Sequence, residues 1–160
     1  MRVGSGGIGF RFERAVIVVA LFFVFLSLPI NAGAADDPSL ENCLRSIEGL
    51  FRDYKVELLR NFVSAGDRVS FSLPGIVPRE GFFSREQLHF IFKDLFRKYT
   101  TLNFDFSKER PVNAGGSPIY LFASWVFQEK GSLRTSRGTI FFSLEKKGER
   151  WWVTILKLSI

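Results

Sequence analysis

The chain has 160 residues, with 22 lysines and arginines, 16 aspartates and glutamates, and a formal net charge of +6 at pH 7. It contains one histidine and one cysteine, which excludes an intramolecular disulfide and the usual zinc sites built from several such ligands. The basic residues are scattered singly or in pairs, unlike the clustered patch of a nucleic-acid-binding protein. We therefore expect no metal, no cofactor and no nucleic-acid partner.

The amino terminus has the pattern of a secretory signal peptide. Three arginines precede an apolar run at residues 15–28, which Pro29 ends, and Ala32-Gly33-Ala34 then supplies the small residues of a cleavage site. An uncleaved membrane anchor is the alternative, but a membrane-spanning helix needs about 20 apolar residues and this run is shorter. The pattern predicts cleavage after Ala34 or one residue later.

Cleavage there divides the chain into a signal peptide at residues 1–34, a flexible start at 35–39 and a single domain at 40–160. We predict an exported protein, periplasmic or extracellular, that contacts the membrane only through the signal segment before cleavage. The G-x-G-x-x-G match at residues 4–9 has no strand before it, so it is not a dinucleotide-binding site.

Apolar residues at helical spacing predict helices in the first half of the domain. One is expected from a cap at residues 36–39 through residue 54, and a shorter one at 56–63. Ser84 and Gln87 form a capping-box pattern that begins the clearest helix. Its predicted buried stripe consists of Leu88, Ile91, Phe92, Leu95, Phe96 and Tyr99.

The remaining segments alternate with the period of a strand. Residues 69–73 do so, and Leu102, Phe104 and Phe106 are expected to share one buried face. Three longer strands are predicted, with a hairpin turn in the last connection: residues 119–128, 135–145 and 150–160. Helices followed by consecutive antiparallel strands predict an α+β fold with the helices packed on one sheet face.

Both faces of two strands are apolar, which is unusual for a sheet with one solvated face. In residues 119–128 the two alternating sets are each rich in aromatic and aliphatic side chains, and the strand at 150–160 is similar. A homodimer through the outer sheet face would cover the second set. The alternatives are a loop folded over the face or an exposed apolar surface.

Four segments carry a recurrent pattern: DRVSFSLPG at residues 67–75, GFFSREQL at 81–88, KDLF at 93–96 and GERWWV at 148–153. Together they resemble the nuclear transport factor 2-like superfamily, and most closely its small exported bacterial domains of unassigned function. Leu95 stands where that group usually has an aromatic residue. The resemblance covers roughly residues 40–160.

The resemblance implies a cone, in which amino-terminal helices pack on a strongly bent antiparallel sheet, with a cavity at the wide end. Superfamily members include isomerases, dehydratases, binding domains and dimerisation modules, so the fold does not settle the function. The aromatic residues expected to line such a cavity are Phe62, Phe92, Phe96, Trp125 and Trp152.

Candidate catalytic groups are few. His89 is flanked by Arg85 and Lys93 on its helix, and like charges disfavour a protonated imidazole. Asp105 alternates against the apolar residues of its strand, which predicts that it faces solvent. Asp94 lies off the apolar stripe of its helix, and the single cysteine, Cys43, is expected to be a buried apolar residue. No catalytic residue is assigned.

The first hypothesis is an exported, non-enzymatic domain that binds a small apolar ligand, or associates with itself or an envelope protein. The second is a cofactor-independent enzyme of the isomerase or dehydratase kind that uses the cone cavity. The third is a membrane-tethered domain that retains its amino-terminal helix.

Overall fold

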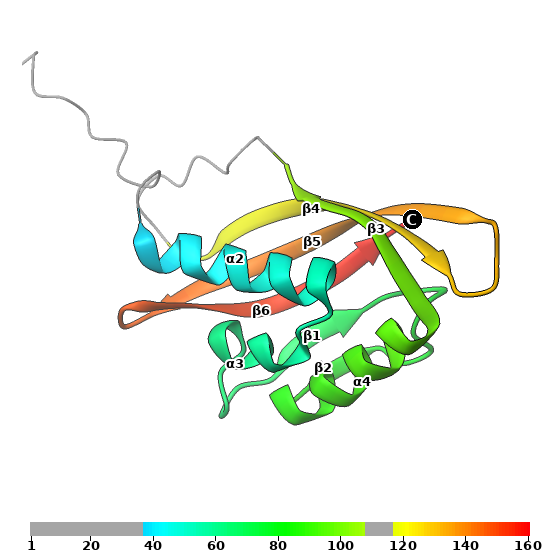
Figure 1. The fold of residues 1–160 in the computed structure, drawn as a ribbon. Helices are drawn as coiled ribbons and strands as arrows, with labels where there is room; N and C mark the ends of the chain where they lie inside the picture. Colours follow the sequence, from blue (N-terminus) through cyan, green and yellow to red (C-terminus); the bar gives the residue numbers. More distant parts are fainter. Residues whose placement is uncertain (1–36, 108–116) are drawn as a thin grey trace, which may run out of the picture. The chain divides into compact units, whose positions relative to one another are not determined.

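A curved six-stranded sheet wraps around the helices in the computed structural model, which describes residues 37–107 and 117–160 (Figure 1). The predicted signal peptide lies outside these residues, as do residues 108–116. No helix of the described part is long and apolar enough to cross a membrane. The helical elements are α2 (Pro38–Asp53), the 3-10 turn η1 (Val56–Leu58), α3 (Leu59–Phe62) and α4 (Arg85–Lys98).

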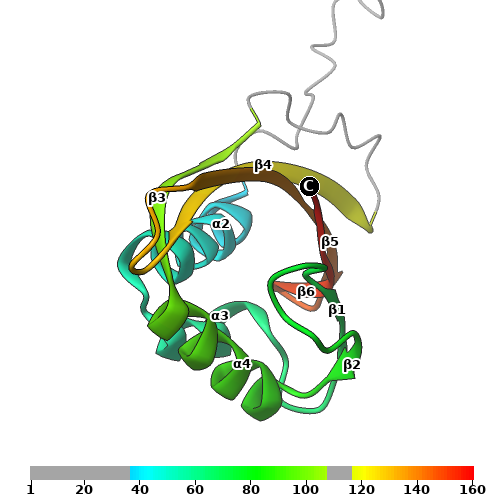
Figure 2. The same ribbon diagram turned by 90° about the vertical axis from the view of Figure 1, so that its right-hand side faces the viewer.

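The strand order in the sheet is β2-β1-β6-β5-β4-β3. Neighbouring strands are antiparallel except β1 and β6, which pair in parallel. The described helices all lie on the concave side of the sheet, and its convex side faces away from them (Figure 2). The strands are β1 (Val69–Ser72), β2 (Gly81–Phe83), β3 (Tyr99–Phe106), β4 (Ile119–Glu129), β5 (Thr135–Lys147) and β6 (Arg150–Ser159). The expectation of helices packed on a bent, mainly antiparallel sheet is confirmed.

Local signals place α4 where the sequence predicted it. Ser84 Oγ accepts a hydrogen bond from the Gln87 N–H at 3.4 Å, and Gln87 Oε1 accepts one from the Ser84 N–H at 2.9 Å. This capping box satisfies two amide groups that would otherwise lack partners at the helix start. Leu88, Phe92 and the following pair Leu95 and Phe96 are buried.

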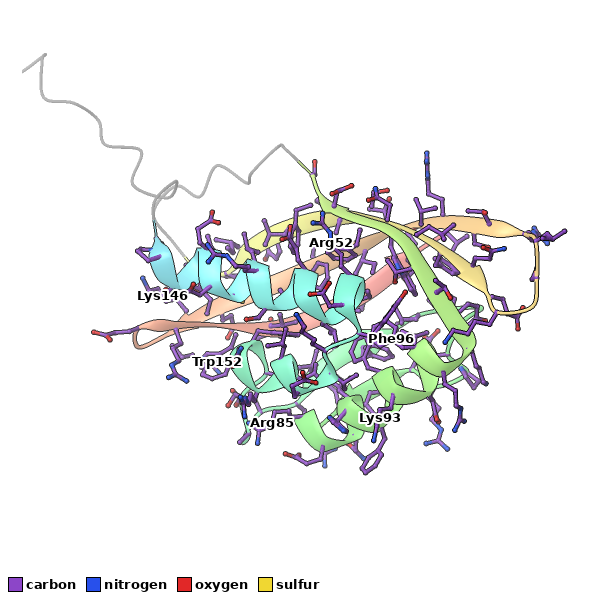
Figure 3. All side chains as sticks on the ribbon, in the orientation of Figure 1. Arg52, Arg85, Lys93, Phe96, Lys146 and Trp152 are labelled. Carbon is purple, nitrogen blue, oxygen red and sulfur yellow. The ribbon has the colours of Figure 1, made fainter. Side chains whose placement is uncertain are left out.

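The start of α2 is joined to the β5–β6 hairpin through Asp37. Its carboxylate caps the helix by accepting from the Ser39 N–H at 2.9 Å. The other carboxylate oxygen accepts from Lys146 Nζ at 2.8 Å and from Trp151 Nε1 at 2.9 Å. Lys146 also lies 5.7 Å from the centre of the Trp151 ring, and Figure 3 places it beside the start of α2. One side chain therefore connects the first helix to β5 and β6.

The prediction for the inward side of β3 is wrong at one residue. Leu102 was expected to be buried with Phe104 and Phe106, but it is 52% exposed while Phe104 is fully buried. The pairing of β3 with β4 shifts register between Thr101 and Asn103, leaving Leu102 without a partner. A β-bulge of this kind turns the following side chains to the other face, so simple alternation fails there.

The last hairpin closes as predicted. Lys147 pairs with Arg150, and the two residues between them make the turn. Gly148 has φ of 63°, the left-handed conformation that a two-residue hairpin turn requires and glycine adopts without strain.

Candidate functional site

Aromatic rings fill the space between the helices and the sheet, where the resemblance implied a cavity. The Phe51 ring stacks on Phe104 with centroids 4.5 Å apart, and it makes edge contacts with Phe92, Phe96 and Trp125 at 5.5–6.1 Å. Figure 3 shows Phe96 projecting from α4 toward this interior. These rings pack against one another as a core.

The five residues predicted to line a cavity fall into two groups, one buried in the core and one half-buried. Phe62, Phe92, Phe96 and Trp125 are buried within this core. Trp152 is half-buried and pairs with Glu145 across β6 and β5, whereas the preceding Trp151 is the buried ring of the pair. Four of the five residues are therefore part of the packed core.

The interior holds little that could transfer a proton. Among the described residues, Ser143 is the one buried polar side chain, and its pairing with Tyr120 and Ile155 places it on the convex side of the sheet. No buried side-chain polar atom of the described residues lacks a hydrogen-bond partner. Burial raises the pKa of the Cys43 thiol to about 12, because the thiolate is costly in an apolar surrounding. The thiol therefore stays protonated and unreactive at neutral pH.

The candidate catalytic groups lie on the surface. Asp105 is exposed, as predicted, and it accepts a hydrogen bond from Arg52 Nη2 at 2.5 Å. Asp94 is paired with Arg97 at 3.0 Å on the exposed side of α4. His89 is half-exposed beside a shallow depression of the α3–α4 surface that Arg60 and Arg85 also line. These groups lie on different surfaces, and no cluster of three or more metal-ligating side chains occurs in the described part of the chain.

Two further surface features have binding potential, and the first is an aromatic patch on the convex side of the sheet. Tyr120 and Phe122 of β4 are 49% and 50% exposed. The Phe141 ring of β5 lies between them, with centroids 5.7 Å from Tyr120 and 5.4 Å from Phe122. Ile155 of β6 continues this surface beyond Ser143. We call Tyr120, Phe122, Phe141 and Ile155 the outer patch.

The second feature is a groove of about 360 Å³ between α4 and the loop that joins β1 to β2. Its polar lining residues are Arg79, Gln87, Asp94 and Lys98. Its apolar walls come from the loop, β2, α4 and the start of β3: Ile76, Val77, Pro78, Phe83, Phe90, Ile91, Leu95 and Tyr99.

The outer patch could be expected from the sequence pattern, whereas the groove could not. The doubly apolar alternation of β4 was the signal for the patch. The groove forms because the loop at residues 73–80 lies against α4, and no periodic pattern in the sequence predicts that contact. The exposed Phe90, which interrupts the polar side of α4, was the one available signal.

No protein-family model matches the chain, and no curated protein matches its sequence. Solved structures nevertheless share its fold. A ketosteroid isomerase-like protein from Erwinia carotovora atroseptica is 11% identical, with 79% of this chain and 96% of that chain covered and a TM-score of 0.57. A candidate polyketide cyclase from Acidithiobacillus ferrooxidans is 12% identical, with coverage of 79% and 89% and a TM-score of 0.56. A candidate isomerase from Rhodopseudomonas palustris is 10% identical, with coverage of 75% and 87% and a TM-score of 0.55.

These similarities confirm the fold that the sequence resemblance implied, a nuclear transport factor 2-like α+β cone. Proteins with this fold include isomerases and polyketide cyclases. At identities near 10%, the likeness shows the fold alone, and the activity has to be argued from this chain's own residues.

Proposed function

We propose that the protein is an exported, non-enzymatic domain that acts by association, and that two copies pair through the outer patch. The observation that carries this proposal is the exposure of Tyr120 and Phe122, which lie together with Phe141 on a face turned away from every described helix (Figure 2). Burying apolar surface yields about 25 cal/mol per Å², so a contiguous aromatic patch favours a partner.

The convex face has the size that a stable dimer needs. Strands β3, β4, β5 and β6 lie side by side. Four strands about 4.8 Å apart, each with roughly ten residues rising about 3.3 Å, cover about 19 by 33 Å. That projected area is about 630 Å², and relief from side chains raises the accessible area toward the 800 Å² per partner of a standard interface.

The charges around the patch favour a second copy over a strongly charged partner. Arg137 and Lys157 are exposed on this face, and Glu145 is half-exposed there. In a twofold pair the same surface meets itself, so a face with one sign of charge would repel its copy. Mixed signs avoid that repulsion, and the aromatic centre supplies the attraction.

The non-enzymatic part of the proposal is supported by the filled interior. Isomerase or dehydratase chemistry in a cone requires a positioned acid or base within reach of a bound substrate. The described interior contains packed rings and no buried carboxylate, while Asp105 is held at the surface by Arg52. An enzyme of that kind would need a space that Phe51 and its neighbours occupy.

Export is supported by the amino-terminal sequence, which has the charge, length and small residues of a signal peptide. Mass spectrometry of the protein expressed from its full-length chain tests it. The proposal predicts a mature chain that starts at or next to Ala35 in the periplasmic fraction or the medium. A membrane-bound chain that retains residues 1–34 would instead support the tethered alternative.

Pairing is tested by a charge placed in the patch. Phe122→Lys should convert a dimer into a monomer in size-exclusion chromatography with light scattering, because burying an unpaired ammonium in an apolar interface is costly. Leu133→Lys is the matched control, since Leu133 is 98% exposed but lies outside the patch. A wild-type monomer at all concentrations, or a dimer that survives Phe122→Lys, would contradict the proposal.

A further inference from the structure

We propose that the groove between α4 and the β1–β2 loop binds a single-chain amphiphile with an anionic head group, such as a free fatty acid. This site is separate from pairing through the outer patch, because the groove is built from the β1–β2 loop, β2, α4 and the start of β3. The patch is built from β4, β5 and β6. A result that contradicts one proposal therefore does not contradict the other.

The groove has the size and walls of a small-ligand site. Its volume of about 360 Å³ lies in the range of about 300–1,000 Å³ that is usual for such sites. Leu95 is buried at its base, and Ile76, Val77 and Ile91 are half-buried along it. These aliphatic side chains suit a hydrocarbon chain, which needs no hydrogen-bond partner.

An exposed phenylalanine lies at the edge of this groove. Phe90 lines both the groove and the depression beside His89, and it is 68% exposed on α4, although the neighbouring Phe92 is fully buried. A ligand that lies in the groove would cover the face of Phe90 together with the aliphatic wall. The hydrophobic gain from that cover favours an apolar chain.

The charges of the groove select the head group. Arg79 and Lys98 line it, and neither makes an ion pair with another described residue. The one acidic residue of the lining, Asp94, is paired with Arg97 at 3.0 Å. Two free cations beside an apolar channel complement a carboxylate joined to a hydrocarbon chain. They would repel a cationic head.

Titration calorimetry of the purified wild-type protein with dodecanoate, below its micelle concentration, tests the site. We expect dodecanoate to bind and dodecyltrimethylammonium, which has the same chain length and a cationic head, to bind at least about tenfold more weakly. Amide chemical-shift changes should map to α4 and the β1–β2 loop. Shifts confined to the outer patch would overturn the proposal, as would equal affinity for the two amphiphiles.

Matched pairs of variants test which residues bind the amphiphile. Lys98→Glu should weaken dodecanoate binding about tenfold, whereas Lys93→Glu, on the same helix but outside the groove lining (Figure 3), should change it less than about twofold. Phe90→Ser should also weaken binding, and Phe82→Ser should not, although the two rings are similarly exposed at 68% and 66%.

All four side chains are exposed, so the variants should fold, and thermal unfolding measured alongside confirms it. Equal effects of Lys98→Glu and Lys93→Glu would overturn the proposal. Binding to anionic lipid vesicles without binding to monomeric dodecanoate would also overturn it, since that outcome assigns the surface to a membrane.

Discussion

Removing the carboxylate of Asp37 should destabilise the domain more than removing any of its exposed ion pairs. Asp37→Ala removes the hydrogen bonds that the carboxylate accepts from three residues, Ser39, Lys146 and Trp151. The helix cap contributes about 1 kcal/mol, the half-exposed Lys146 ion pair about 0.5 kcal/mol, and the Trp151 N–H left without an acceptor costs about 1 kcal/mol or more. The sum is about 2 to 3 kcal/mol, which corresponds to a fall in Tm of about 10 °C for a domain of this size.

Differential scanning calorimetry of Asp37→Ala and Asp67→Ala measures this effect against a matched control. Asp67 pairs with Lys147 at 2.8 Å, next to Lys146 on the same strand, but the Asp67 side chain is 44% exposed against 21% for Asp37. A pair in solvent contributes little, so Asp67→Ala should lower Tm far less. Equal shifts in the two variants would refute the view that Asp37 joins the helix to the sheet.

Three further outcomes follow from the same structure. Hydrogen bonds from Lys146, then Ser39 and Trp151, hold the pKa of Asp37 well below its usual range. The stabilisation of the folded state by the Asp37 carboxylate is therefore complete above about pH 4, the carboxyl pKa of the unfolded chain, and is lost as the pH falls further. In urea unfolding, Asp37→Asn should lose less stability between neutral and low pH than the wild type loses. Because Cys43 is buried and its thiol pKa is raised, it should react with a thiol reagent only at the rate of unfolding. Rapid labelling of the native protein would contradict the burial of Cys43. Gly138→Ala should cost about 1 to 3 kcal/mol in denaturant unfolding, because an added Cβ would meet a Leu158 side-chain carbon at 2.6 Å and a backbone oxygen at 3.0 Å. Gly66→Ala, which meets nothing within 4 Å, should be nearly neutral.

Local chemistry explains which elements could be predicted from the sequence. Helix α4 carries its own start signal in Ser84 and Gln87 and its own buried stripe, so its position followed from residues close in the chain. The closing hairpin likewise carries Gly148 at its turn. Each of these signals acts within a few residues and does not depend on the rest of the fold.

Features that depend on distant segments were missed. The parallel pairing of β1 with β6 joins residues that are far apart in the sequence, as in the pairing of Phe71 with Leu156. The short strand β2, which pairs with β1 across the loop at 73–80, was also missed. The bulge at Leu102 is set by the pairing of β3 with β4, and alternation alone predicted the wrong face. Register of this kind is a property of two strands together.

The candidate sites also differ in whether local sequence or distant contacts determine them. The helical period correctly predicted that Phe92 is buried, and Trp125 was expected only as a possible cavity residue. A period cannot say whether facing side chains leave a cavity between them. Here Phe51 meets both rings and fills the space. The outer patch could be anticipated because two of its residues, Tyr120 and Phe122, alternate with the buried residues of β4. The groove is assembled from a loop and a helix that approach only in the folded chain.

Sedimentation velocity of the wild-type mature protein, from nanomolar to high micromolar concentration, tests whether two copies pair. We expect one species at twice the mass of the chain at the higher concentrations, with dissociation on dilution. A single species with the mass of one chain throughout would contradict pairing through the outer patch.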